Sequence, residues 1–136
     1  MPAGFVSAAP DDHVKLFFLP DGEKKPTLPS MGSRGLEFPD GLPRPAHRDY
    51  TPRRYEGAAG ELDIDLVVHG DGPASTWASR AAPGAYIGVA GPRGSFVVPD
   101  TFDWYLLAGD ETALPAIGRR LRELRGRSRG RVHRSG

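Results

Sequence analysis

The sequence contains no cysteine, which excludes a disulfide framework and a thiolate metal site. It has no apolar run near the roughly 20 residues that a membrane-spanning helix needs, so no stable membrane insertion is expected. Residues 1–10 lack the basic and apolar segments of a signal peptide, which favours a cytoplasmic protein. His69 has no second histidine or acid at ligand spacing, so no metal site is predicted.

Glycine and proline, by contrast, are abundant. The 18 glycines and 14 prolines make up nearly a quarter of the 136 residues. This composition favours short strands joined by turns over long helices. The length suggests one domain of ordinary size, with enough chain to bury a core.

The net charge of +1 conceals an uneven distribution. Residues 119–136 hold eight arginines and one acid, whereas the other 118 residues hold 10 basic and 16 acidic ones. Such a basic segment raises the possibility of nucleic-acid binding. It has no interleaved aromatic residues, however, and the rest of the chain is acidic. We therefore predict a solvated, disordered tail over 126–136 and no nucleic-acid partner.

The spacing of apolar residues predicts a series of short strands up to about residue 100, and a strand followed by a helix after it. Strands are expected over 13–19, 48–55, 61–69, 85–91, 96–98 and 103–108. Helices are expected over 73–81, with Pro73 in the first turn, and over 112–125, and 26–46 reads as a long loop. We predict a mainly β fold, in which antiparallel barrel strands over 1–100 precede the start of an α/β domain over 101–125.

The first group of candidate binding residues lies in Arg-Asp-Tyr-Thr-Pro-Arg, residues 48–53. In a strand, Arg48 and Tyr50 point to one face and Thr51 to the other. The guanidinium matches a phosphate, the phenol ring stacks on flat ring systems, and the hydroxyl suits a ring nitrogen or carbonyl. These residues suit a ligand with a diphosphate and an aromatic ring system, although an ordinary exposed strand would look the same.

The second group surrounds a glycine-rich turn before the predicted helix at 73–81. Free backbone N–H groups at a helix N-terminus bind phosphate, and glycine lets the anion approach closely. Ser75 adds a hydroxyl and Trp77 a ring that covers a ligand. The alternative is a plain connection between a strand and a helix, with Trp77 in the core and His69 purely structural.

The third group is the strand, turn and helix start over 106–115. Nucleotides bind at such turns in open parallel sheets. The turn is not G-x-G-x-x-G, so the general dinucleotide fingerprint does not apply. Asp110 and Glu111 would serve equally well as helix caps with no ligand present.

Taken together, these segments resemble the siderophore-interacting protein family of the ferredoxin-reductase-like superfamily. The resemblance covers about residues 13–124 and rests on four blocks in the family order. These blocks are R-D-Y-T-P-R, H-G-D-G-P-A-S-T-W-A, P-G-A-Y-I-G-V-A-G-P-R-G-S and D-W-Y-L-L-A-G-D-E-T-A-L-P-A-I.

The resemblance implies FAD as cofactor and NAD(P)H as electron donor, with a ferric siderophore as substrate and a monomeric enzyme. It places the pyrophosphate at Arg48, the isoalloxazine at Tyr50, and flavin N5 near Thr51. Val67 and His69 would line the flavin, and Thr112 would lie where the nicotinamide approaches. The phosphate-binding turn and its cover would comprise Gly72, Ala74, Ser75 and Trp77. No residue of this chain is predicted to be catalytic in its own right, because the flavin carries the chemistry.

The chain also departs from the family pattern. Compared with that pattern, barrel strands are missing before residue 13 and βα units are missing after residue 124, so a truncated member is expected. The arginine-rich sequence from 125 onward suggests that this segment is translated out of frame from a GC-rich gene. The predicted function is NAD(P)H-driven reduction of ferric siderophores, and the alternative is a flavin-binding or inactive remnant.

Overall fold

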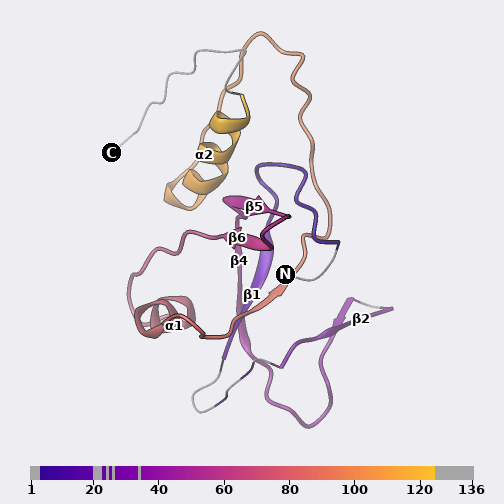
Figure 1. The fold of residues 1–136 in the computed structure, drawn as a ribbon, viewed down its shortest axis with the longest axis vertical. Coiled ribbons are helices and arrows are strands. Elements are labelled where there is room, and N and C mark those ends of the chain that lie inside the picture. Colours follow the sequence, from indigo (N-terminus) through magenta and orange to yellow (C-terminus); the bar gives the residue numbers. More distant parts are fainter. Residues whose placement is uncertain (1–3, 20–22, 24, 26, 34, 125–136) are drawn as a thin grey trace. The chain divides into compact units, whose positions relative to one another are not determined.

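The computed structural model describes residues 4–19, 23, 25, 27–33 and 35–124 (Figure 1). The predicted disordered tail at 126–136, and the proposed change of reading frame, lie outside these residues. The chain divides into two compact units, which we describe separately. Unit 1 contains 1–13, 51–65 and 92–136, and unit 2 contains 14–50 and 66–91.

Unit 2 is built on a three-stranded antiparallel sheet. β1 (Val14–Phe18) lies between β4 (Ala46–Tyr50) and β7 (Gly88–Ala90). Four of its five residues are buried, as the apolar text of this segment predicts. The predicted strands over 13–19 and 85–91 are thus confirmed, apart from their ends.

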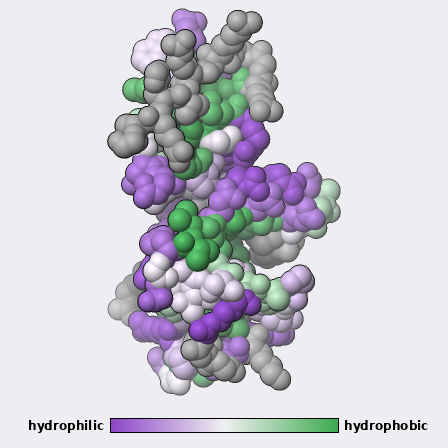
Figure 2. All heavy atoms as spheres, turned by 90° about the vertical axis from the view of Figure 1, so that its left-hand side faces the viewer, coloured by the Kyte–Doolittle hydropathy of each residue, from purple (hydrophilic) through white to green (hydrophobic). Residues whose placement is uncertain are grey.

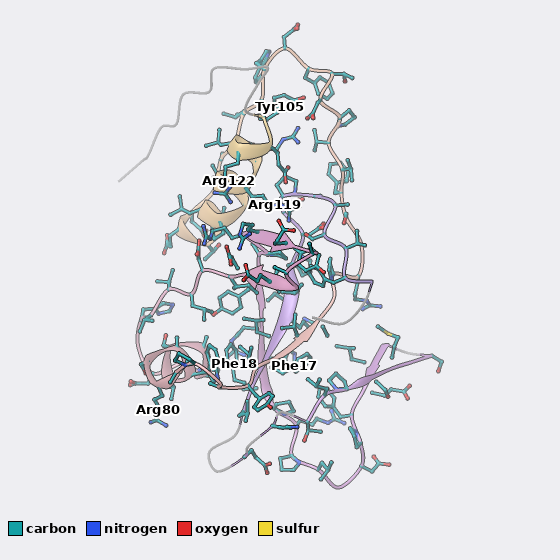
Figure 3. All side chains as sticks on the ribbon, in the orientation of Figure 1. Phe17, Phe18, Arg80, Tyr105, Arg119 and Arg122 are labelled. Carbon is teal, nitrogen blue, oxygen red and sulfur yellow. The ribbon has the colours of Figure 1, made fainter. Side chains whose placement is uncertain are left out.

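Both faces of β1 are covered within unit 2. On one face, Phe18 lies 6.1 Å from Trp77 of α1 (Pro73–Arg80), measured between ring centroids. On the other, Phe17 lies 5.4 Å from His47 and 6.1 Å from Phe38 (Figure 3). The aromatic pair Phe17–Phe18 therefore forms the centre of this unit, because alternation sends the two rings to opposite faces.

The long loop predicted over 26–46 contains a hairpin that the sequence did not reveal. β2 (Ser30–Gly32) pairs with β3 (Gly35–Glu37), and Gly35 adopts a φ of +117°. That conformation is open to glycine and strained for other residues. The Gly/Pro content of the region concealed two strands of three residues each, too short for a periodic pattern to show.

Unit 1 contains a second hairpin and two helical segments. β5 (Arg54–Glu56) pairs with β6 (Glu61–Asp63), and the turn between them is closed by a hydrogen bond from the Gly60 N–H to the Gly57 carbonyl. The helical segments are the 3-10 turn η1 (Glu111–Ala113) and α2 (Leu114–Glu123), close to the helix predicted over 112–125.

Arginine side chains and one buried carboxylate hold unit 1 together. Arg119 of α2 donates to the Ser7 carbonyl at 2.8 Å, the Ser7 hydroxyl at 2.7 Å and the Pro52 carbonyl at 3.2 Å. Asp12 Oδ2 accepts from Ser7 Oγ, the Ala9 N–H and Ser95 Oγ at 3.0, 3.1 and 2.7 Å. Segments distant in the sequence are thereby joined by polar contacts more than by apolar packing.

Two predicted strands are shorter than expected. The strand over 48–55 is divided into β4 and β5, because Pro52, buried between them, has no N–H to donate to a ladder. The strand over 61–69 ends at Asp63. Beyond it, Val67 and Val68 are 58% and 60% exposed and do not enter a core as predicted.

The strands predicted over 96–98 and 103–108 do not form. Phe96, Trp104 and Leu106 are 76%, 75% and 80% exposed. A strand-favouring apolar segment forms a strand only where a second strand satisfies the hydrogen-bonding groups of its backbone. None of the described strands pairs with these residues. Figure 2 shows hydrophobic areas in green between hydrophilic ones on the face that it draws.

The fold class agrees with the prediction, with mainly antiparallel β structure and two helices. The described strands form one three-stranded sheet and two hairpins, and they do not close into a barrel. No helix in this part of the chain combines the length and apolar character that a bilayer crossing requires.

Candidate functional site

The register of β4 on β1 decides which way the first candidate residues point. Arg48 lies opposite Leu16, and Tyr50 lies opposite Val14, so these four side chains share a face. Lys15 and Asp49 occupy the other face, where their side chains form an ion pair of 2.7 Å. The prediction that Arg48 and Tyr50 share one face is thus confirmed, whereas Thr51, predicted on the other face, lies beyond the end of β4.

The guanidinium of Arg48 is exposed and carries no carboxylate partner within the described part of the chain. Its Nη1 donates to the carbonyl of His47 at 2.7 Å. Beside it, the half-buried Tyr50 presents a ring: burial raises the pKa of its phenol, and the positive charge of Arg48 offsets part of that rise. The pair therefore offers an unneutralised cation and a neutral ring on one surface.

Helix α1 lies over the same face of the sheet. Its Trp77 contacts Phe18, and alternation places Phe18 on the face of Leu16 and Val14. The helix contacts both β1 and β4 (Figure 1). The strand pair and the helix that follows the glycine-rich turn are therefore brought together, as a ligand bound by both would require.

The N-terminus of α1 offers free backbone donors. Pro73 occupies the first turn, Gly72 is the N-cap, and no side chain caps this end. The first intrahelical bond runs from the Thr76 N–H to the Gly72 carbonyl at 2.9 Å, so the amides of Ala74 and Ser75 precede it. No acidic residue lies in the first turn, so its partial positive charge stays available to an anion.

The two glycines of the turn have different reasons to be glycine. Gly70 has a φ of +57°, a left-handed conformation that disfavours a side chain. Gly72 has a φ of −67°, and a Cβ added there would meet no atom within 4 Å. Nothing in the folded chain demands glycine at 72, whereas a ligand approaching the helix end closely would.

Ser75 does not present its hydroxyl to the turn's surface. It is 5% exposed, and its Oγ both accepts from the His69 N–H at 3.0 Å and donates to the His69 carbonyl at 2.8 Å. The His69 and Val67 side chains are exposed on the loop before α1.

Two of the predicted residues fall in unit 1. Thr51 follows β4 directly and is half-buried, and Thr112 lies in η1. The hydroxyl and N–H of Thr112 both donate to Asp110 Oδ1, at 2.6 and 2.9 Å. These bonds lower the pKa of Asp110, which caps η1 as the sequence suggested it would.

Sequence reasoning missed the part played by Phe18. This residue aligns α1 with the sheet through Trp77, so Trp77 has the packing role that was weighed as the alternative to covering a ligand. The signal was present in β1, where four of the five residues are apolar, since such a strand is expected to be buried on both faces.

The assembled face suits FAD, which contains a diphosphate and a flat tricyclic ring. A guanidinium without a carboxylate partner and uncapped amides are the kinds of donor that a diphosphate needs, and a phenol ring is the kind of surface on which a tricycle stacks. The chain matches the model of the siderophore-interacting FAD-binding domain over residues 2–96, which is most of its length. The chain belongs to this siderophore-interacting family.

A second family model, named siderophore-interacting protein, matches residues 102–135. The match runs through the arginine-rich segment, where the sequence alone suggested a change of reading frame. Family resemblance that continues to residue 135 weakens that suggestion. FAD, the cofactor expected for the siderophore-interacting family, is named in the description of the first model.

Relatives of known name agree with this assignment. The NADPH-dependent ferric-chelate reductase of Escherichia coli is 48% identical over 122 residues, which are 89% of this chain and 46% of that protein. The ferric vibriobactin reductase ViuB of Vibrio cholerae is 36% identical over 130 residues, 95% of this chain and 47% of that protein. The chain therefore spans about half the length of these relatives.

Among solved structures, a siderophore utilization protein from T. fusca superposes with a TM-score of 0.76. It is 43% identical, and the alignment covers 90% of this chain and 46% of the other. The siderophore-interacting protein SipS of Aeromonas hydrophila superposes with a TM-score of 0.56 at 32% identity, covering 90% of this chain and 44% of the other.

Proposed function

We propose that this chain is the FAD-binding part of an NAD(P)H-dependent ferric-siderophore reductase. The names of the relatives from Escherichia coli and Vibrio cholerae support the reaction, and the matched family supports the cofactor. A cytoplasmic, monomeric protein acting on a ferric siderophore belongs to the same proposal.

One observation carries the proposal: the strand register that puts Arg48 and Tyr50 on the face where Trp77 of α1 meets Phe18. A cofactor that contacts the sheet at one end and the helix at the other can bind only if the helix packs on the face of the sheet that carries the binding residues. A cation, a ring and the free amides at one helix end, in one unit, meet that need.

In this proposal the diphosphate is bound by Arg48 and by the N–H groups of Ala74 and Ser75, with Gly72 giving it room to approach. The isoalloxazine stacks on Tyr50. FAD, when bound, would supply the redox chemistry, which is hydride transfer from NAD(P)H followed by electron transfer to ferric iron.

The remaining predicted residues have supporting parts. Val67 and His69, on the loop before α1, would line the flavin. The resemblance assigns Thr51 a role near flavin N5 and Thr112 a role near the nicotinamide, and both roles stay predictions, because these residues belong to unit 1. Trp77 holds the helix on the sheet and borders the cofactor.

Titration of the apoprotein with FAD, followed by flavin fluorescence, tests the binding site. Arg48→Ala removes a charge-assisted bond to phosphate and should raise the Kd about 10- to 100-fold. Tyr50→Ala should raise the Kd about 5- to 100-fold through lost stacking. Arg44→Ala and Tyr86→Ala, which change exposed residues of unit 2 outside the site, should leave the Kd within about twofold of the parent. Unchanged FAD affinity in both site variants would refute the assignment.

A second candidate is a flavin-binding protein without reductase activity. The absence of a strand over 103–108 favours it, because the predicted NAD(P)H-binding domain would begin with that strand. Anaerobic addition of NADPH to the yellow protein separates the two candidates: bleaching supports the reductase, and a persistent yellow colour supports the flavin-binding protein.

A further inference from the structure

The hydroxyl of Ser75 makes both of its hydrogen bonds with the backbone of one residue, His69. Ser75 is the third residue of α1 and is buried, yet its side chain contacts the peptide groups on both sides of His69, six residues earlier. The two bonds, 3.0 Å from the His69 N–H and 2.8 Å to its carbonyl, close the turn into a ring.

A serine hydroxyl has one proton, and this one goes to the His69 carbonyl. A phosphate oxygen can be bound only by a donor. While the bond to His69 holds, Ser75 Oγ therefore has no proton for an anion, even though its position at the start of a helix suggests such a role. The backbone N–H groups at the same helix end have no such commitment.

The ring encloses residues that are costly to order. Gly70 and Gly72 lose more conformational freedom on ordering than other residues do. The helix makes two further bonds to the turn, from the Thr76 N–H to the Gly72 carbonyl at 2.9 Å and from the Thr76 hydroxyl to the Asp71 carbonyl at 3.5 Å, a long contact. Among these bonds, those of Ser75 are the ones that reach His69, at the start of the turn.

We propose that Ser75 is a positioning residue: its hydroxyl clasps His69 and shapes the 69–75 turn before the cofactor arrives, while backbone amides bind the diphosphate. The inference rests on the proposed FAD site. A turn that is already ordered removes part of the entropy cost of binding. The two Ser75–His69 hydrogen bonds therefore raise FAD affinity although Ser75 Oγ does not contact FAD.

Hydrogen exchange of the apoprotein separates positioning from direct ligation, because no FAD is present. In Ser75→Ala the His69 N–H loses its acceptor, so its exchange should quicken about 5- to 10-fold, and the Kd for FAD should rise by a similar factor. Thr76→Ala, at the neighbouring position, should change both quantities less than about twofold. Ser75→Cys replaces the hydroxyl with a weak donor at nearly constant size. If Ser75→Ala fails to fold, the His69 exchange rate and the Kd for FAD are measured on this variant instead.

The outcomes are distinct. Weaker FAD binding with unchanged His69 exchange in the apoprotein would mean that Ser75 ligates the diphosphate directly, which overturns the inference. Faster exchange with unchanged FAD affinity would overturn it too, because the clasp would then be structural only. If the parent protein and all variants fail to bind FAD, the proposed function itself fails, whatever the exchange rates show.

Discussion

Glycine at position 72 has a functional explanation that glycine at position 70 does not need. Gly72→Ala introduces a methyl group into space that is open in the folded chain, at a φ accessible to any residue. We expect a stability loss within about 1 kcal/mol, since alanine is a poorer N-cap than glycine. FAD affinity should fall at least about tenfold, because the methyl group blocks close approach of the diphosphate to the helix end.

Gly94→Ala is the matched control for this substitution. Gly94 also has open space around its Cβ position and no positive φ, but it lies in unit 1. Urea unfolding gives the stability change and FAD titration the affinity change for both variants. Equal FAD affinities in the two variants would show that Gly72 does not lie against the cofactor.

Asp12 should make unit 1 sensitive to acid. Burial raises its pKa, but hydrogen bonds from the Ala9 N–H, Ser95 and Ser7 outweigh this and leave the pKa below the ordinary 3.8. Because the folded value is lower than the unfolded one, the carboxylate stabilises the fold above about pH 4 and loses this effect as the pH falls through its folded pKa.

Asp12→Asn should therefore cost about 1–3 kcal/mol at pH 7 and less near pH 3. Its amide NH₂ would also take the place of Oδ1, which has no hydrogen-bond partner. Urea unfolding of both proteins from pH 7 to pH 3 measures the difference. A difference that stays constant over this range would show that the carboxylate's charge does not matter.

At the scale of elements, local signals predicted some segments well and failed for others. β1 and α1 were predictable because a mostly apolar run and Pro73 at a helix start are signals that act within a few residues. The predicted strand over 61–69 forms only at β6, which pairs with β5, and the one over 103–108 does not form, although both segments are rich in strand-favouring residues. The remaining residues have no partner among the described strands, and pairing is not encoded locally.

Helix α2 depends on Arg119, which apolar periodicity does not identify. The apolar Leu114, at the start of this helix, is 45% exposed, whereas the Arg119 side chain (Figure 3) is only 13% exposed and binds Ser7 and Pro52. Arg119→Ala removes donors from two partly buried carbonyls and should lower the free energy of unfolding by about 1–3 kcal/mol.

Glu123→Gln is the control for Arg119→Ala. It removes only the i,i+4 ion pair of 2.8 Å with Arg119 and should cost no more than about 0.5 kcal/mol. Chemical unfolding followed by circular dichroism measures both losses. Similar losses in the two variants would locate the contribution of Arg119 in the ion pair and not in the carbonyl contacts.

For the whole molecule, the order of motifs predicted the family but not which residues share a unit. Arg48, Tyr50 and Trp77 come together because β4 pairs with β1 in one particular register, which no local pattern specifies. Thr51 and Thr112 belong to the other unit, although Thr51 directly follows Tyr50 in the chain. This boundary between the units lies beside Pro52, which separates β4 from β5. In the sequence, that proline is seen only as part of the binding motif.

The uneven distribution of buried aromatic residues predicts where a protease will first cut this chain. Chymotrypsin cleaves after aromatic residues in backbone that can leave its native conformation, which requires few ladder bonds and exposed side chains. Phe96, Phe102 and Trp104 are 76%, 58% and 75% exposed and lie outside every described strand, whereas Phe17 and Phe18 are buried in the central strand of unit 2. Limited digestion followed by mass spectrometry should therefore yield first cuts between 96 and 104. Early cuts after Phe17 or Phe18 would mean that the β4-β1-β7 sheet opens as readily as the unpaired segment, and the face that carries Arg48 and Tyr50 would then lack the rigid support that preorganised cofactor binding requires.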